Sequence, residues 1–260
     1  MSVVQRLWAG GGWRAFVVPA GLLVFAEFAA RTSGPSESLA PPSAVAVAFI
    51  DAMGSGELLV ATRDTLLSAF GGLAIGALIG LACGILLGSL RALDRLADLT
   101  IEVLRPIPSV AVIPIALVAL GFGYRLEIAI VAFACTWPLL VLTRAAVRGV
   151  EPRLLEVAKV LKLSPRARVM KVILPAALPR IFVAFRLAVG VALVVAVTVE
   201  IAVNPMGLGN GIMVAGQALQ PQIMLAYLAW IGLVGYSLNA LLTLAQAHLF
   251  GRAAQTEAIR

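Results

Sequence analysis

Residues 66–90 read LLSAFGGLAIGALIGLACGILLGSL, a run of 25 residues without a charged side chain. A helix needs about 20 consecutive apolar residues to cross a bilayer, so this stretch predicts a transmembrane helix. Five other apolar runs lie along the 260-residue chain, at about residues 16–30, 103–120, 128–142, 181–203 and 224–244. The pattern predicts an all-α membrane protein with about six transmembrane helices.

The composition excludes several classes of protein. Apolar residues make up 61% of the chain and charged residues 13%, against about 45–50% and 25% in soluble domains. These values exclude an ordinary cytosolic enzyme, a disordered chain and a disulfide scaffold. The net charge is +7, and most of the basic residues lie between the apolar runs. This placement indicates that they orient the chain in a membrane rather than bind nucleic acid. Cys83 and Cys135 lie in apolar runs and the one histidine is His248, so no metal site is expected.

The distribution of basic residues predicts which side each end of the chain faces. With the N-terminus in the cytoplasm, 15 of the 20 Lys and Arg residues fall in inner segments and three in outer segments. Inner loops carry an excess of these residues, so both termini are expected to be cytoplasmic. Arg6 and Arg14 before the first run also fit a cleaved signal peptide, but Glu27 and Phe28 near any cleavage position favour a retained helix.

The chain is expected to divide into three parts. Residues 1–60 would hold the first transmembrane helix and a periplasmic segment, and residues 61–250 a core of about five transmembrane helices. Residues 251–260 would form a cytoplasmic tail. Within the periplasmic segment, residues 43–53 suggest a short amphipathic helix with Ser43 as its N-cap.

Glycines recur at every fourth residue along the longest run. Such spacing places them on one stripe of a helix, and a stripe of this kind lets another backbone approach closely in lipid. We call this set the glycine stripe, and it consists of Gly72, Gly76, Gly80, Gly84 and Gly88. The glycine stripe predicts tight helix packing, with pore lining as the alternative.

Other residues within the runs suit a translocation path. Pro106, Pro108 and Pro114 predict a kinked or broken helix whose freed carbonyls need partners in protein or at a water-filled cavity. A plain entry turn with one kink is the alternative. Arg186 and Glu200 are charges in the fifth run, where charged groups usually face the protein interior or water. Each could instead reach the nearer membrane surface.

The longest inner loop, residues 151–179, carries the most specific pattern. It reads EPRLLEVAKVLKLSPRARVMKVILPAALP and predicts two short helices, the second with Ser164 as N-cap and Pro165 as first residue. The first helix has an apolar face formed by Leu154, Leu155, Ala158 and Leu161. A helix so short needs a surface on which to bury that face. By physical argument, anionic lipid and a groove on a partner protein fit equally well.

This loop resembles the EAA loop of ABC-importer permeases, whose pattern is E-A-A-x3-G-x9-I-x-L-P. The matching positions are Glu156, Val157, Ala158, Val172, Leu174 and Pro175. Lys162 stands where the pattern has glycine. Lysine permits a helix there but is not expected to permit a left-handed turn or a very close backbone contact.

The resemblance extends over about residues 39–251. Residues 104–108 (LRPIP), followed by Ile113 and Pro114, resemble the nitrate/sulfonate/taurine/bicarbonate branch of these permeases. Glu200 and residues 207–209 (GLG) also sit where that branch has similar residues.

The resemblance implies a type I ABC-importer permease with a cytoplasmic two-helix coupling loop, residues 151–179. A periplasmic or lipid-anchored binding protein would deliver a small anionic solute to two permease copies in a bacterial inner membrane. The chain would hold no cofactor and would not be an enzyme; ATP and Mg would bind to a cytoplasmic ABC ATPase homodimer. The residues implied to couple the permease to that ATPase are Leu154, Leu155, Glu156, Ala158, Leu161, Lys162, Ser164, Pro165, Leu174 and Pro175.

An ion- or proton-coupled secondary transporter remains the alternative, with Glu200 and Arg186 as its coupling charges. Nucleotide binding by this chain is not expected, because residues 204–211 (NPMGLGNG) lack the GxxxxGK[ST] pattern. These glycines indicate a tight outer turn.

Overall fold

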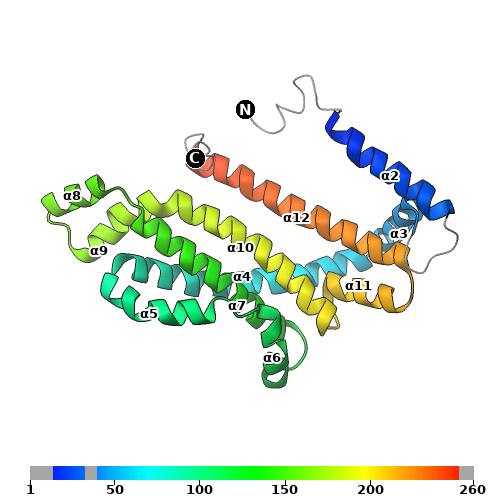
Figure 1. Ribbon diagram of the computed structural model, residues 1–260, viewed down its shortest axis with the longest axis horizontal. Helices are drawn as coiled ribbons and strands as arrows, with labels where there is room; N and C mark the ends of the chain where they lie inside the picture. The colour runs from blue at the N-terminus through cyan, green and yellow to red at the C-terminus, as the bar shows by residue number, and fades with distance from the viewer. Residues whose placement is uncertain (1–13, 33–39, 252–260) are drawn as a thin grey trace. The chain divides into compact units, whose positions relative to one another are not determined.

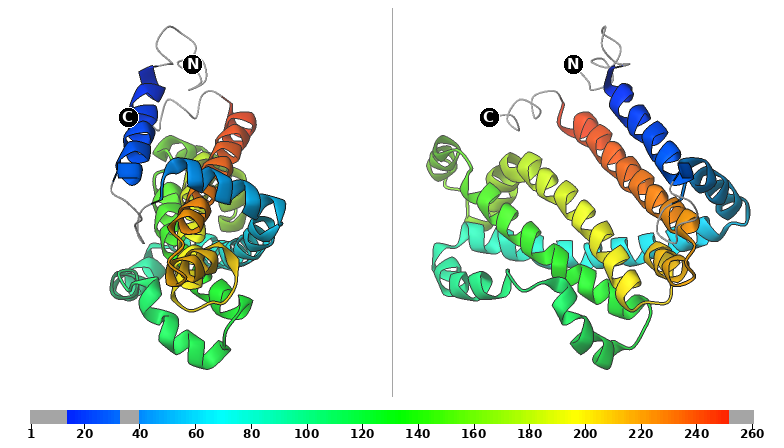
Figure 2. Two further views of the ribbon diagram at one scale, coloured as in Figure 1. Left: turned by 90° about the vertical axis from the view of Figure 1, so that its right-hand side faces the viewer. Right: turned by 45° about the vertical axis from the view of Figure 1, so that its right-hand side comes forward.

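The computed structural model describes residues 14–32 and 40–251, and every regular element in those two ranges is helical. Figures 1 and 2 show the course of these helices. The all-α prediction is confirmed. Arg6 and the predicted tail at residues 252–260 lie outside the described residues.

Four helical segments in the described ranges are long and apolar enough to cross a membrane. They are α4 (Glu57–Ser89), α7 (Tyr124–Arg148), the segment Pro165–Gln217, whose helix breaks between Ala202 and Gly207, and α12 (Pro221–Phe250). A bent helix pair from Arg91 to Leu120 would make a fifth. The first predicted run forms α2 (Arg14–Thr32), which is not among these segments.

The chain falls into two compact units, and the larger one comprises Ala61–Asn210 and the described residues from Gly232 onward. Its core forms where α7 packs along α10 (Leu174–Ala202), side by side in Figures 1 and 2. The side chains of Ile130 and Leu139 on α7 are buried there with small residues of α10 such as Ala188. Small residues on α10 let the two helices approach closely.

The glycine stripe of α4 faces α7. A Cβ atom on Gly76 would lie 2.7 Å from the carbonyl oxygen of Ala132, and one on Gly80 would lie 2.7 Å from that of Thr136. The other members of the stripe face α7 at similarly short range, and they are Gly72, Gly84 and Gly88. Any side chain at these positions would force the two helices apart.

The third apolar run is not one kinked span. Helix α5 (Arg91–Leu104) ends just before Pro106 and Pro108, and the 3-10 turn η1 (Ser109–Val112) then leads into α6 (Ile113–Leu120). The axes of α5 and of the segment Ser109–Leu120 are bent by 82° relative to each other. Pro114 lies in the first turn of α6, where its missing N–H needs no partner, so it does not kink the helix.

Helix α5 is amphipathic and was not expected from the sequence. Its buried Asp94 pairs with Arg144, at 2.7 Å from Nε, and with Arg148, both on α7. Asp98 also receives a hydrogen bond of 2.7 Å from Arg144. These ion pairs fix α5 along the end of α7.

The coupling loop differs from two separate short helices. Helix α8 (Pro152–Val160) forms as predicted, but α9 (Pro165–Arg168) continues through the π-turn η2 (Val169–Ile173) into α10. Pro175 in the first turn of α10 has no N–H to donate, and a wider π-turn is one way in which a helix accommodates such a break. The predicted second helix is therefore the start of a long helix.

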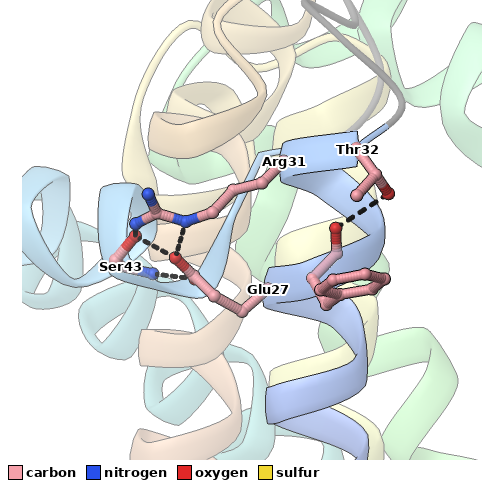
Figure 3. A network of polar contacts seen from close by, with 5 residues as sticks. Glu27, Arg31, Thr32 and Ser43 are labelled. Atoms are coloured by element: carbon pink, nitrogen blue, oxygen red, sulfur yellow. Dashed lines mark hydrogen bonds and ion pairs between the residues drawn. The ribbon is translucent and has the colours of Figure 1, made fainter.

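In the smaller unit, α2 is joined to α3 (Pro42–Gly54) by a polar network shown in Figure 3. The Glu27 carboxylate accepts hydrogen bonds from the Ser43 backbone N–H at 2.9 Å and from Arg31 Nε at 2.6 Å. Ser43 lies inside the helix and makes no side-chain cap, contrary to the sequence prediction. Glu27 instead satisfies a backbone donor that the first turn of α3 leaves free.

Candidate functional site

The coupling loop presents a mixed surface because α8 has an inward and an outward side. Ala158 is fully buried, and the half-buried Leu155 packs on the apolar cluster of Val147, Ile173 and Ala177. Ala158 therefore cannot form the outer contact that the sequence predicted for it, whereas Leu155 still exposes part of its side chain. The apolar side chains that α8 and its C-cap expose are Leu154, Val157, Val160 and Leu161. Glu156 is exposed beside them.

Lys162 ends α8 in a left-handed conformation, with φ at +49°. The Lys162 N–H donates to the Lys159 carbonyl at 2.9 Å, and the Leu163 N–H donates to the Ala158 carbonyl at 3.1 Å. This pair of bonds is a Schellman motif, in which glycine is the preferred residue at the left-handed position. The prediction that lysine does not permit a left-handed turn here is therefore wrong. The left-handed conformation explains why the pattern of the family has glycine at this position.

The remaining predicted coupling residues surround the start of the long helix. Ser164 Oγ accepts a hydrogen bond of 3.3 Å from the Ala167 N–H, so Ser164 is the N-cap and Pro165 the first helical residue, as predicted. Leu174 packs partly on the same cluster as Leu155, and Pro175 is exposed in the first turn of α10.

At the opposite end of α10, Glu200 belongs to a buried polar network. Its Oε2 accepts a hydrogen bond of 2.7 Å from the Gly209 N–H, and Thr65 Oγ1 accepts one of 2.9 Å from the Leu208 N–H. Both donors lie in the first turn of α11 (Gly207–Gln217). Carboxylates are favoured at a helix N-terminus, where they satisfy free donors and complement the dipole.

The glycines at the start of α11 make room for this carboxylate. Gly207 has φ at +85°, and a Cβ atom there would overlap the Glu200 carboxylate. A Cβ atom on Gly209 would lie 2.7 Å from the Glu200 Cβ. Glycine is therefore required at both positions for Glu200 to cap α11.

Glu127 and Asn204 complete what we call the Glu200 network, which comprises Thr65, Glu127, Glu200 and Asn204. The Asn204 Nδ2 donates to Glu127 Oε2 at 2.7 Å, and Asn204 Oδ1 accepts from the Gly123 N–H at 2.8 Å. All four side chains are at most 2% exposed. The network fixes the start of α11 to α4, α7 and α10.

Sequence reasoning missed Glu127, Asn204 and Thr65. The available signal was Glu127 itself, an acidic side chain that immediately precedes the fourth apolar run. Charges near membrane segments are costly and usually have partners, so Glu127 and Glu200 could have been paired as candidates.

The other residues predicted for a translocation path do not join the Glu200 network. Arg186 lies within α10, half-buried, and has no hydrogen bond or ion pair among the described residues. Pro106, Pro108 and Pro114 are exposed around the break between α5 and α6.

The chain is similar in sequence to known membrane transport proteins. A family model described as "Binding-protein-dependent transport system inner membrane component" matches residues 72–255. The putative aliphatic sulfonates transport permease protein SsuC of Bacillus subtilis is 31% identical over 226 residues, which cover 86% of this chain and 82% of that protein. The bicarbonate transport system permease protein CmpB of Synechococcus elongatus is 36% identical over 169 residues, covering 65% and 61%.

A solved structure also resembles the chain. An inward-facing conformation of the MetNI methionine ABC transporter superposes with a TM-score of 0.65 at 24% sequence identity. The alignment covers 76% of this chain and 96% of that chain. The likeness shows a shared fold, which is the architecture expected from the sequence.

Proposed function

The chain belongs to the family of binding-protein-dependent transport system inner membrane components, and from this premise we propose that two copies of it form the path for a small oxyanion in an ABC importer. It is a permease subunit and a multi-pass membrane protein. The relatives named for aliphatic sulfonates and bicarbonate support an oxyanion as solute. Family membership favours ATP-driven import over the ion-coupled carrier.

The proposed partners follow from the same premise. A cytoplasmic ATPase homodimer binds ATP and Mg and drives transport, and a periplasmic or lipid-anchored binding protein delivers the solute. Both termini of the permease lie in the cytoplasm, which places the coupling loop beside the ATPase. The permease itself then supplies binding and movement rather than catalysis.

The exposed face of α8 is the observation that carries this proposal. Leu154, Val157 and Leu161 are between 41% and 64% exposed and lie on one side of the helix. Their burial in a groove of the ATPase would remove apolar surface from water, which favours association. Glu156 adds an exposed carboxylate that can pair with a basic group at the rim of that groove.

A continuous helix supports a mechanical link between the coupling loop and the start of α11. From Pro165 to Ala202 the chain is helical without a break, a length of about 57 Å at 1.5 Å per residue. One end lies beside α8 and the other carries Glu200, which caps α11. We propose that a shift of the coupling loop, driven by closure of the ATPase dimer, moves the start of α11 through this helix.

Cross-linking tests the docking surface. In a Cys83→Ala background, Leu154→Cys is expected to form a cross-link with a bifunctional thiol reagent to the ATPase subunit in membranes. Ile50→Cys is the control, because Ile50 is also an exposed apolar residue and lies on α3, far from α8 in the sequence. Cys135 is kept because it is fully buried. A cross-link from Ile50→Cys but none from Leu154→Cys would contradict the proposal.

Transport assays test the solute. Proteoliposomes holding the permease and its ATPase are expected to take up a radiolabelled sulfonate or bicarbonate only with ATP and the cognate binding protein. Uptake driven by an ion gradient without the ATPase would instead support the secondary carrier. Uptake of a neutral solute in preference to both anions would refute the oxyanion.

A further inference from the structure

The Glu200 network holds two carboxyl groups and no basic side chain. Glu127 and Glu200 are at most 2% exposed, and their side chains lie within hydrogen-bonding reach of each other in the larger unit. Among the described residues, neither of them forms an ion pair. Burying a carboxylate without a cation is strongly unfavourable, and two neighbouring carboxylates also repel each other. Two full negative charges therefore do not fit this site.

Each of the two carboxyl groups uses only one of its oxygens. Oε2 of Glu127 accepts from the Asn204 side chain at 2.7 Å, and Oε2 of Glu200 accepts from the Gly209 N–H at 2.7 Å. Both Oε1 atoms are shielded from solvent and have no hydrogen-bond partner among the described residues. Ionised carboxyl groups only accept hydrogen bonds, so two of them can bond to each other only when one carries a proton. A single proton would supply the donor that the pair lacks.

The occupant of this site has to be very small. The two Oε1 atoms have no exposed surface, so a metal ion, a water molecule or a solute cannot reach them in this conformation. A proton needs no cavity, because it lies on one oxygen and within hydrogen-bonding distance of the next. Ser68, fully buried on α4 beside Glu127, has an Oγ without a hydrogen-bond partner in the described chain and offers a further acceptor for such a proton.

The charged groups around the pair do not neutralise it. On α4, Asp64 adds another carboxylate, which is paired with Arg63 at 2.8 Å and accepts a hydrogen bond from the Tyr124 hydroxyl at 2.9 Å. Arg125, the basic residue of α7 nearest to Glu127 in the sequence, is exposed. At the end of α10 and the start of α11, Glu200 is the one charged residue between 187 and 217. The surroundings therefore favour removal of negative charge from the pair.

We propose that Glu127 and Glu200 share one proton while Glu200 caps α11, and that loss of this proton releases the start of α11. The positive end of the α11 dipole stabilises a charge on Glu200, so the proton resides mainly on Glu127. When the first turn of α11 moves away, water reaches the pair and accepts the proton, and no other covalent bond changes. Both carboxyl groups are then charged, and their repulsion opposes the return of α11.

The pair would make the movement of α11 depend on pH. The closed state binds one proton more than the open state, so the closed state is favoured at low pH and weakens as the pH rises. An effect of this movement on uptake rests on the proposed function. The binding of the proton does not, because it follows from the buried pair alone.

Infrared spectroscopy tests for the proton directly. The full chain in nanodiscs, without ATPase or solute, is expected to show the carbonyl stretch of a neutral carboxylic acid at neutral pH. Labelling with carbon-13 glutamate should shift this band, and Glu127 and Glu200 are the two glutamates that are buried in the described chain. Glu127→Gln keeps the shape of the side chain but cannot carry the acidic proton, so the band should disappear. Glu102→Gln, at an exposed position of α5, is the control and should retain it.

Hydrogen exchange of residues 207–217 tests the link to movement. If opening of α11 releases one proton, its opening equilibrium should rise about tenfold per pH unit near neutrality, after correction for the intrinsic exchange rate. Glutamine at position 127 is neutral at every pH, and its amide group donates in place of the proton. Glu127→Gln should therefore abolish this slope, whereas Glu102→Gln should leave it unchanged.

Three results would overturn the proposal: no glutamate band at neutral pH, a band of full intensity in Glu127→Gln, or opening of α11 in the unaltered protein that does not change with pH. If Glu127→Gln fails to assemble, the labelled band and the pH slope of the unaltered protein still decide. Neither measurement includes solute or ATPase, so a failure of the proposed transport function would leave both results unchanged.

Discussion

Lys162 shows what a single left-handed residue does at the end of the coupling helix. With φ at +49°, its side chain crowds its own backbone, whereas glycine would adopt this conformation freely. The Schellman hydrogen bonds that it makes hold α8 at a fixed angle to α9. Lys162 therefore adopts a backbone conformation that its side chain disfavours, because the hydrogen bonds of the turn hold it there.

Lys162→Gly is expected to stabilise the protein by about 1 kcal/mol, because it removes a left-handed side chain. The measurement is the thermal unfolding midpoint of the purified permease in one detergent. Lys159→Gly is the matched control: it also replaces a lysine of this loop, but within helical backbone, and should destabilise by about 1 kcal/mol. A lower midpoint for Lys162→Gly than for the unaltered protein would contradict the argument.

Gly209 is the second residue whose identity follows from geometry. Gly209→Ala places a Cβ atom 2.7 Å from the Glu200 Cβ and 3.0 Å from the Ile201 nitrogen. The expected cost is about 1–3 kcal/mol, measured as a lower unfolding midpoint together with reduced uptake. Gly190→Ala is the control, because no atom lies within 4 Å of its added Cβ on α10. That variant should be neutral or more stable, and the same loss in both would refute the close packing.

Residue patterns predict only some of these roles. Glu200 stood out because it is a charge within an apolar run, whereas Asn204 looked like part of an ordinary turn. Its function depends on Glu127, 77 residues away, and on the Gly123 N–H. Contacts at such separations are set by helix packing, which a single sequence does not specify.

At the scale of elements, the contact between α4 and α7 depends on the absence of side chains along one stripe. Gly80→Leu would put a Cβ atom 2.7 Å from the Thr136 carbonyl and 2.8 Å from the Leu139 Cβ. Separation of the two helices should cost about 3 kcal/mol and lower the yield of monodisperse protein in size-exclusion chromatography.

The matched control for this variant is Ala74→Leu, which adds the same side chain to an exposed position of α4. It should leave yield and unfolding midpoint nearly unchanged. If Gly80→Leu matched this control, the glycine stripe would not be a packing surface.

The elements were predictable to different degrees for physical reasons. Helices such as α4, α7 and α12 follow from long apolar runs, because lipid leaves the backbone few alternatives. Helix α5 was missed because it is amphipathic and stands between runs, where its ion pairs to Arg144 and Arg148 decide its place. The continuity of α9 with α10 was missed because Ser164 and Pro165 mark a helix start but do not reveal that the helix runs on.

At the scale of the whole permease, the long helix from Pro165 to Ala202 is the physical link in the proposed cycle. One end of this helix follows the Schellman turn and α8, and near the other end the Glu200 side chain caps α11. A rigid rod transmits displacement, whereas a flexible one absorbs it. Coupling should therefore depend on the stiffness of this helix, independently of contacts at either end.

A pair of exposed substitutions in the rod tests this dependence. Ala176→Gly combined with Leu178→Gly should weaken the local helix by about 2 kcal/mol, because glycine has a low helix propensity. Both side chains are exposed, so the substitutions leave the packing of the core unchanged. ATP hydrolysis by the assembled importer should persist, while solute transported per ATP falls several-fold in proteoliposomes. Leu241→Gly with Leu244→Gly on α12 introduces the same flexibility into exposed positions of a helix outside the rod. An unchanged transport ratio for the first pair, or an equal fall for both pairs, would show that the helix from Pro165 to Ala202 does not carry the coupling.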